Sequence, residues 1–143
     1  MALDPDADVW QLPIVGFEVI DVWFSAQLYV IAYGEGRDTS LGVAPPRTQI
    51  ALGGPFLLRS ADGSDQRLNA EEPWDTFVPV LSLRGTRVVA ATATRSGALD
   101  VRFDDGSTLS AGPDPRYENW EMSGPDGLHL VAPPGGGDPR ISA

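Results

Sequence analysis

The sequence contains no cysteine, no lysine and a single histidine, His129. The absence of cysteine excludes thiol nucleophiles, disulfides, iron–sulfur clusters and zinc fingers. The absence of lysine excludes Schiff-base catalysis and a P-loop lysine. His129 lies between Leu128 and Leu130, so on a strand its side chain points away from theirs, toward solvent. We therefore expect no catalytic triad, no metal site and no cofactor.

The chain also lacks a long apolar run. Its most apolar region, residues 14–33, is interrupted by Glu18, Asp21, Ser25 and Gln27, whereas a membrane helix needs about 20 apolar residues. The first ten residues carry three aspartates and no basic residue, which is unlike a secretory signal. We expect no membrane association and a cytoplasmic location.

Basic side chains are outnumbered by acidic ones, 10 to 20, so the formal net charge is −10. The basic residues are all arginines, and they are dispersed along the chain. Binding to nucleic-acid backbones needs clustered basic residues, so we expect no nucleic-acid partner. Two interpretations of the charge stay open: it maintains solubility, or it steers a basic protein partner.

The length and composition predict a single domain over residues 1–143. Hydrophobic residues make up 42% of the chain, enough for the core of one domain of this size. Glycine and proline together make about a fifth of the residues, which is below the proportion typical of disordered chains. We expect an ordered core over residues 10–132 and flexible ends at 1–9 and 133–143.

Alternating apolar and polar residues between frequent turn residues predict a mainly β protein. The tight turn Asp104-Asp105-Gly106-Ser107 is the clearest hairpin signal. The fold class we expect is an antiparallel sandwich, or a strongly bent sheet, of about eight or nine short strands. The predicted strands cover residues 16–24, 27–33, 47–52, 55–60, 86–94, 99–103, 108–111, 117–122 and 128–132. Residues 34–46 are interpreted as a loop, with a short strand at 40–43 as the alternative.

One short helix is expected between residues 71 and 83. Trp74, Phe77, Val78 and Leu81 recur at i, i+3, i+4 and i+7, which is one face of an α-helix. Pro79 removes a backbone donor inside this run, so the helix should be short or kinked there.

A weak internal correspondence exists at an offset of 70 residues. Val19 matches Val89, Ile50 matches Trp120, and Leu58 matches Leu128. Chance accounts for so few matches as well as a duplication does. A duplication would predict two similar β halves, related by a pseudo-two-fold axis and joined by the helix.

The four tryptophans are interpreted in two ways. Trp23, Trp74 and Trp120 are expected to anchor the core. Trp10 lies beside the acidic start of the chain, and we expect it near the surface as an interface anchor.

Five carboxylates gather in the second half of the sequence. They lie in or beside the predicted hairpins, so we expect them to form an acidic face. This set is Asp104, Asp105, Glu118, Glu121 and Asp126. The Asp104–Ser107 turn lacks the ligand spacing of a calcium loop, which leaves partner binding as the expected role of these residues.

Several short motifs together resemble a known family. They are W-x-L-P at residues 10–13, F-x-D-G-S-x-L at 103–109, Y-E-x-W-E at 117–121, G-P-x-G at 124–127 and P-G-G at 134–136. From about residue 10 to 137, the chain resembles an uncharacterised, domain-of-unknown-function family of short acidic proteins from high-GC bacteria. The resemblance brings no catalytic residues and implies an immunity or accessory role in a bacterial toxin system. Family members often continue from P-G-G to a tryptophan, whereas this chain continues with Gly137-Asp138.

The leading hypothesis is a non-enzymatic protein-binding module with an acidic surface, an immunity-type inhibitor of a toxin or of another partner protein. It needs complementary charge and aromatic anchors, not a catalytic set.

A small carboxylate-dependent hydrolase is an alternative, since two acidic groups suffice; it would require a pocket holding acidic groups with raised pKa values. A structural or assembly subunit of a larger complex is another, and it would require a large apolar patch. The oligomeric state stays open.

Overall fold

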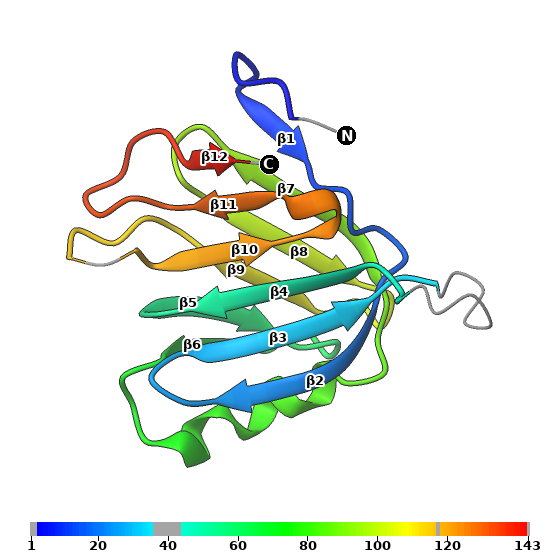
Figure 1. Cartoon of the computed structure of the whole chain (residues 1–143). Helices are drawn as coiled ribbons and strands as arrows, with labels where there is room; N and C mark the ends of the chain where they lie inside the picture. Colours follow the sequence, from blue (N-terminus) through cyan, green and yellow to red (C-terminus); the bar gives the residue numbers. More distant parts are fainter. Residues whose placement is uncertain (1–2, 36–43, 117, 143) are drawn as a thin grey trace.

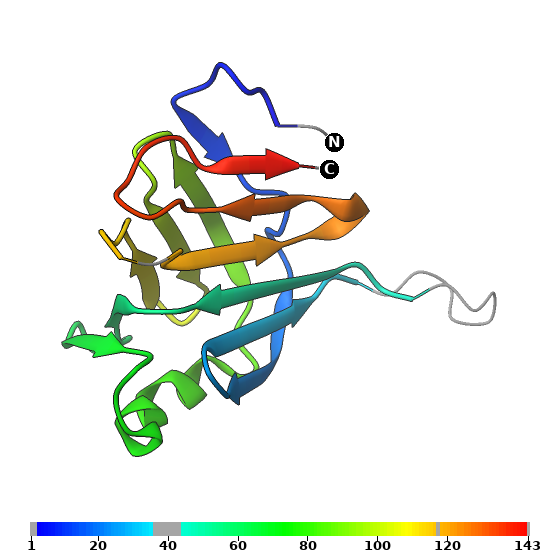
Figure 2. The same ribbon diagram turned by 60° about the vertical axis from the view of Figure 1, so that its left-hand side comes forward.

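The chain forms a sandwich of two antiparallel sheets. The computed structural model describes residues 3–35, 44–116 and 118–142, and within them twelve strands form two six-stranded sheets. Sheet A has the order β1 (Val9–Gln11), β7 (Val88–Thr94), β8 (Leu99–Phe103), β9 (Thr108–Ala111), β5 (Pro55–Arg59) and β6 (Asp65–Asn69). Sheet B has the order β12 (Arg140–Ser142), β11 (His129–Val131), β10 (Trp120–Ser123), β4 (Arg47–Leu52), β3 (Leu28–Tyr33) and β2 (Glu18–Phe24). Figures 1 and 2 show sheet A behind sheet B.

The core lies between the two sheets. Alternate residues of each strand point inward, and Leu52, Leu58, Leu109 and Trp120 are fully buried there. The Trp120 indole N–H donates a hydrogen bond to the carbonyl oxygen of Gly97 at 2.8 Å, so its one polar atom is satisfied inside the core. The predicted sandwich and the predicted core position of Trp120 are confirmed.

Apart from the terminal strands β1 and β12, the strand order is two-fold symmetric. The first half of the chain contributes the meander β2-β3-β4 to sheet B and the hairpin β5-β6 to sheet A. The second half contributes the meander β7-β8-β9 to sheet A and the hairpin β10-β11 to sheet B. Both first strands carry a register shift at the equivalent place, between Val19 and Asp21 in β2 and between Val88 and Ala90 in β7. The strand order is therefore that of two similar halves.

The offset of 70 residues describes this symmetry only in part. It superposes β2 on β7, which are equivalent strands, but it also places Ile50 of β4 on Trp120 of β10, which are not. The equivalent of β4 is β9, because the two halves differ in loop length.

The described residues form twelve strands where we expected eight or nine, and β1, β6 and β12 are the ones not predicted. Strands β1 and β12 contain only three residues each, and β6 has the largely polar sequence DQRLN, so none of them shows the alternation on which strand prediction depends. We expected no strand after Pro133, yet β12 pairs with β11. The alternative strand at 40–43 lies outside the described residues.

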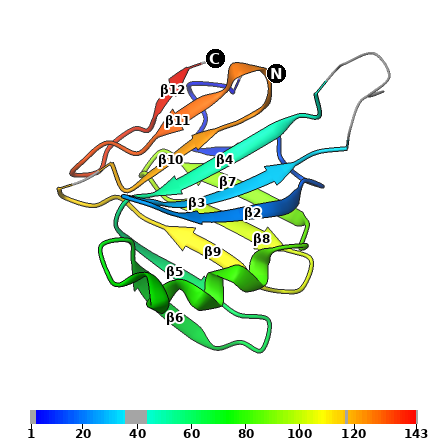
Figure 3. The same cartoon turned by 60° about the horizontal axis from the view of Figure 1, so that its bottom comes forward.

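The two open sides of the sandwich differ in what lies along them. Strands β1 and β12 are the edges on the side where both chain ends lie (Figure 1). The helix η2 (Trp74–Leu83) lies along the opposite side, where β2 and β6 are the edges (Figure 3).

Helix η2 is a 3₁₀-helix, so the predicted α-helical face is wrong. It buries Phe77, Val80 and Leu83, a spacing of three that follows from three residues per turn. Pro79 lies inside it and has no N–H to donate to an α-helical hydrogen bond. Trp74, Val78 and Leu81 are exposed.

Phe77 fixes η2 to the sandwich. Its ring stacks on Phe24 of β2 at 5.5 Å and on Phe56 of β5 at 6.4 Å, so one side chain joins the edge of sheet B to the interior of sheet A. The stack therefore anchors η2 together with Val80 and Leu83, which are fully buried.

Replacing Phe77 by alanine should lower the free energy of unfolding by about 3–5 kcal/mol, because a buried aromatic ring is lost and a cavity is left. Val78→Ala is the matched control, since Val78 is 53% exposed and its truncation should change stability by less than about 0.5 kcal/mol. Urea unfolding followed by tryptophan fluorescence measures both. Equal effects of the two substitutions would contradict the 3₁₀ register.

Candidate functional site

Large exposed apolar side chains gather at one corner of the molecule. Six such side chains lie on β2 and η2, which pack against each other through the Phe24–Phe77 stack. We call this surface the aromatic corner; it comprises Ile20, Trp23, Phe24, Trp74, Val78 and Leu81. Trp23 is 58% exposed and Trp74 is 71% exposed, so the prediction that both anchor the core is wrong.

The strand register explains the exposure of Trp23. It lies opposite Tyr29 of β3 on the outer face of sheet B, while the next residue, Phe24, turns toward η2. A groove of about 310 Å³ lies between the β2–β3 turn and η2, with Phe24, Trp74 and Phe77 in its lining. The surface of the aromatic corner is therefore concave beside Phe24 and Trp74.

The charge around the aromatic corner is acidic. Glu71 and Glu72 line the groove, and Asp75 lies in the first turn of η2. The two nearby arginines are engaged: Arg84 donates a hydrogen bond to the carbonyl oxygen of Ile20 at 3.1 Å, and Arg87 pairs with Glu18 at 3.2 Å.

The predicted acidic face is divided between the sheets. Asp104 and Asp105 occupy the β8–β9 turn of sheet A, where Asp104 accepts the backbone N–H of Arg87 at 3.0 Å and Asp105 accepts that of Ser107 at 2.9 Å. Both carboxylates therefore stabilise the local backbone conformation through these hydrogen bonds. Asp126 lies in the short turn η3 (Pro125–Gly127) between β10 and β11, with a positive φ of 60°.

The structure brings Glu118 and Glu121 together beside sheet B. Glu118 pairs with Arg140, and Glu121 contacts the His129 ring nitrogen at 2.5 Å. All four line one hollow of about 310 Å³. His129 is half-exposed, in keeping with the predicted orientation of its side chain.

Trp10 is buried, 3% exposed, so its prediction as a surface anchor is wrong. Because β1 pairs with β7, Trp10 lies opposite Ala93 and points into the core. Its indole N–H donates to the carbonyl oxygen of Asp4 at 2.6 Å, and the Arg95 guanidinium stands 5.8 Å from the ring centre.

Arg95 ties the two ends of the described chain together. It donates hydrogen bonds to the carbonyl oxygens of Pro5 and Ala7, at 2.5 and 3.0 Å, and to the Asp138 carboxylate at 2.7 Å. The arginine therefore links the segment before β1 to the segment before β12.

Arg95→Gln should free both segments, because hydrogen bonds from a charged donor and the contact with Trp10 are lost together. We expect amide hydrogen exchange at residues 4–11 and 138–142 to accelerate about tenfold or more. Arg102→Gln is the control, since Arg102 is exposed and only 3.8 Å from Asp100. Unchanged exchange at both segments in R95Q would contradict this role.

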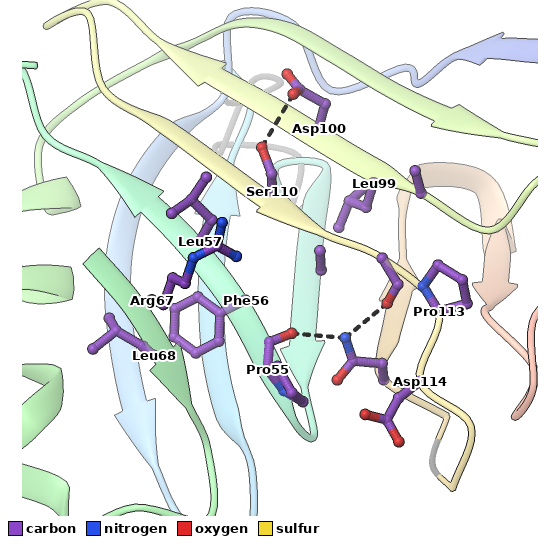
Figure 4. A pocket seen from close by; sticks show the side chains of 14 residues that line it. Pro55, Phe56, Leu57, Arg67, Leu68, Leu99, Asp100, Ser110, Pro113 and Asp114 are labelled. Carbon is purple, nitrogen blue, oxygen red and sulfur yellow. Dashed lines mark hydrogen bonds between the residues drawn. The ribbon is translucent and has the colours of Figure 1, made fainter. Parts of the chain in front are cut away.

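A further pocket, of about 440 Å³, opens at the end of sheet A (Figure 4). We call it the sheet A pocket. Leu57 and Arg67 lie on one side of it, and Pro113 and Asp114 on the other. The residues lining it are Pro55, Phe56, Leu57, Arg67, Leu68, Ala98, Leu99, Asp100, Ser110, Ala111, Gly112, Pro113, Asp114 and Asn119.

Two buried polar side chains line the sheet A pocket. Asn119 is 2% exposed, and its amide nitrogen donates to the carbonyl oxygens of Pro55 and Gly112 at 2.7 and 2.8 Å. Its amide oxygen has no hydrogen-bond partner. Asp114 is 9% exposed and accepts the backbone N–H of Arg116 at 2.8 Å. The sequence pattern marked neither residue, because nothing in it shows that two loop residues are buried.

Within the described part of the chain, no three histidine, aspartate or glutamate side chains come together as a metal site. Nor does any helix there have the length and apolarity needed to cross a membrane.

The comparisons with known proteins identify a family. No curated protein and no solved structure matches the chain. The model of a family of unknown function, DUF6188, matches residues 10–138. This match covers most of the chain, and the chain therefore belongs to the DUF6188 family.

Proposed function

We propose that this protein is a non-enzymatic binding module that holds a basic partner protein at the aromatic corner, as an immunity-type inhibitor of a toxin or of another partner. The exposure of Trp23 and Trp74 on neighbouring elements carries this proposal. Clustered exposed apolar side chains mark candidate interaction sites, and tryptophan is among the residues that contribute most to binding energy at interfaces.

The edge position of β2 supports the same surface. β2 ends sheet B, and beyond Val19 no strand of the described chain pairs with its outer side. Exposed edge strands normally carry charged residues, bulges or proline that block association. The first part of β2 has such features in Glu18, Asp21 and the register shift, whereas residues 22–24 are Val-Trp-Phe. An edge with this sequence suits contact with another protein.

Charge complementarity favours a basic partner. The chain carries a net charge of −10, and the groove of the aromatic corner is lined by Glu71 and Glu72 as well as by Trp74. An arginine or lysine of the partner would meet carboxylates and an indole face together. Long-range attraction would also speed the encounter.

The test uses this chain and the purified products of its neighbouring genes, with binding measured by biolayer interferometry. Trp23→Ala and Trp74→Ala should each weaken binding about 30-fold or more, since a hot-spot residue contributes at least about 2 kcal/mol. Val15→Ala is the matched control, because Val15 is 61% exposed but lies outside the aromatic corner. The association rate should fall as salt is raised.

Three outcomes would contradict the proposal. The first is that no neighbouring gene product binds. The second is that both tryptophan variants bind the partner as tightly as V15A does. The third is concentration-dependent self-association through Trp23 and Trp74 in light scattering, which would point to an assembly subunit instead.

A further inference from the structure

The outer side of β2 meets different neighbours before and after its register shift. Before the shift, the Val19 N–H donates to the carbonyl oxygen of Thr86, and the Val19 carbonyl oxygen accepts the N–H of Gly85, both at 2.8 Å. At the shift, the Arg84 side chain donates to the carbonyl oxygen of Ile20 at 3.1 Å. After the shift, no backbone segment of the described chain bonds to this side of the strand.

The backbone groups of Val22 and Phe24 point away from sheet B. The Ser25 N–H donates to the carbonyl oxygen of Gln27 at 2.9 Å, which continues the β2–β3 ladder as a hydrogen-bonded pair. Hydrogen-bonded and non-hydrogen-bonded pairs alternate in an antiparallel ladder, so Trp23 belongs to the next hydrogen-bonded pair. Val22 and Phe24 therefore direct two N–H and two C=O groups outward, and within the described part of the chain these four groups make no hydrogen bond.

The side chains beside this open edge differ between its two faces. Val22 packs against the core and Phe24 stacks on Phe77 of η2, so this face of β2 adjoins the helix. Asp21 and Trp23 lie on the opposite face. Figure 3 shows η2 on the sheet A side of β2, alongside β5 and β6. An added strand would therefore have one face toward η2 and the other beside a carboxylate and an indole ring.

The charge near the open edge selects the occupant. Asp21 lies in β2 itself, Glu71 and Glu72 line the groove at the end of β2, and Asp75 lies in the first turn of η2. A second copy of this chain, with its net charge of −10, would bring like charges together here. A basic segment would meet opposite charge, and its cations would also be attracted to the face of the Trp23 indole.

We propose that β2 binds its partner by strand addition. An extended segment of the partner, in which basic residues alternate with apolar ones, pairs antiparallel with residues 21–24 and extends sheet B beyond β2. Its apolar side chains lie opposite Val22 and Phe24, toward η2, and its basic side chains lie opposite Asp21 and Trp23. This inference rests on the proposed binding role of the aromatic corner and adds the chemistry of the segment that is bound there.

The test is an NMR titration with the peptide acetyl-Arg-Val-Arg-Val-Arg-amide. At a peptide concentration about ten times the Kd, hydrogen exchange of the Val22 and Phe24 amides should slow about tenfold, because their N–H groups are bonded only in the complex. Exchange at Trp23 should change less, since its N–H already bonds to β3. The acidic peptide acetyl-Glu-Val-Glu-Val-Glu-amide should not bind.

N-methylated peptides test the backbone pairing directly. Methylating both valine nitrogens removes the N–H groups that meet the carbonyl oxygens of Val22 and Phe24, and should weaken binding about tenfold or more. Methylating two arginine nitrogens is the matched control. These N–H groups point away from β2 in the added strand, so the affinity should stay within about threefold of that of the parent peptide.

Val22→Pro is the corresponding change in the protein. It removes an outward N–H without breaking a β2–β3 hydrogen bond, and proline is accepted at such positions of edge strands. V22P should bind the peptide about tenfold more weakly or not at all, whereas Val22→Thr, which keeps the N–H, is the matched control. Urea unfolding shows whether both variants are folded; if V22P is not, the comparison of the two methylated peptides decides.

Strand addition is overturned if the parent peptide does not bind, if the two methylated peptides bind alike, or if exchange at Val22 and Phe24 is unchanged. Slower exchange at these residues at high protein concentration without peptide would also overturn it, by assigning the edge to a second copy. The proposed function fails separately, in the binding of neighbouring gene products. Weakening of that binding by Trp23→Ala and Trp74→Ala, together with a failed peptide test, would leave the aromatic corner as a contact through side chains alone.

Discussion

The structure depends on the exchange of hairpins between the two halves of the chain. Strand β10 of the second half completes sheet B by pairing with β4, and strand β5 of the first half completes sheet A by pairing with β9. Trp120 lies opposite Leu52 at one junction, and Leu58 lies opposite Leu109 at the other. All four are fully buried, so neither half can form the core without the other.

Without β1 and β12, this exchange leaves four edge strands, β2, β6, β7 and β11, and the rest of the chain covers them unequally. The edge of β7 is covered by β1, which inserts Trp10 opposite Ala93. By the two-fold strand order β2 is the equivalent of β7, but its neighbour is the helix η2, which contacts it through the Phe24–Phe77 stack. Trp10 of the covering strand β1 is buried, whereas Trp23 and Phe24 of β2 remain exposed beside the helix.

Strand positions could be predicted from the sequence where a strand has one face in the core. The alternation of Leu99, Val101 and Phe103 with polar residues marks β8, and the Asp-Gly turn marks the β8–β9 hairpin. Both faces of β2 carry apolar residues, a pattern typical of a strand that is buried on both sides. The exposure of Trp23 depends on what covers that face in the folded chain, and local sequence does not contain this information.

The same limit applies to η2 and to the candidate sites. The spacing of Trp74, Phe77, Val78 and Leu81 fits a period of 3.6, whereas the 3₁₀ geometry makes Val80 a core residue and leaves Val78 and Leu81 exposed. Trp74 shares the register of Phe77 and Val80 but is the first residue of η2, and it is exposed there. Three of the carboxylates predicted to bind a partner, Asp104, Asp105 and Asp126, lie in turns. Aspartate is common in turns because its side chain accepts hydrogen bonds from nearby backbone N–H groups, so acidic residues near a predicted hairpin do not by themselves indicate a binding face.

The aromatic corner and the sheet A pocket lie beside two different kinds of connection. The link from β6 to β7 joins the two halves and begins and ends in sheet A, and the helix η2 within it lies along the side where β2 and β6 are the edges. The link from β9 to β10 lies within the second half and passes from sheet A to sheet B. Asn119 joins this second link to β5 through the Pro55 carbonyl. Neither link is part of a strand ladder, so the exposure of its side chains depends on local contacts such as the Phe24–Phe77 stack and not on the alternation of a strand.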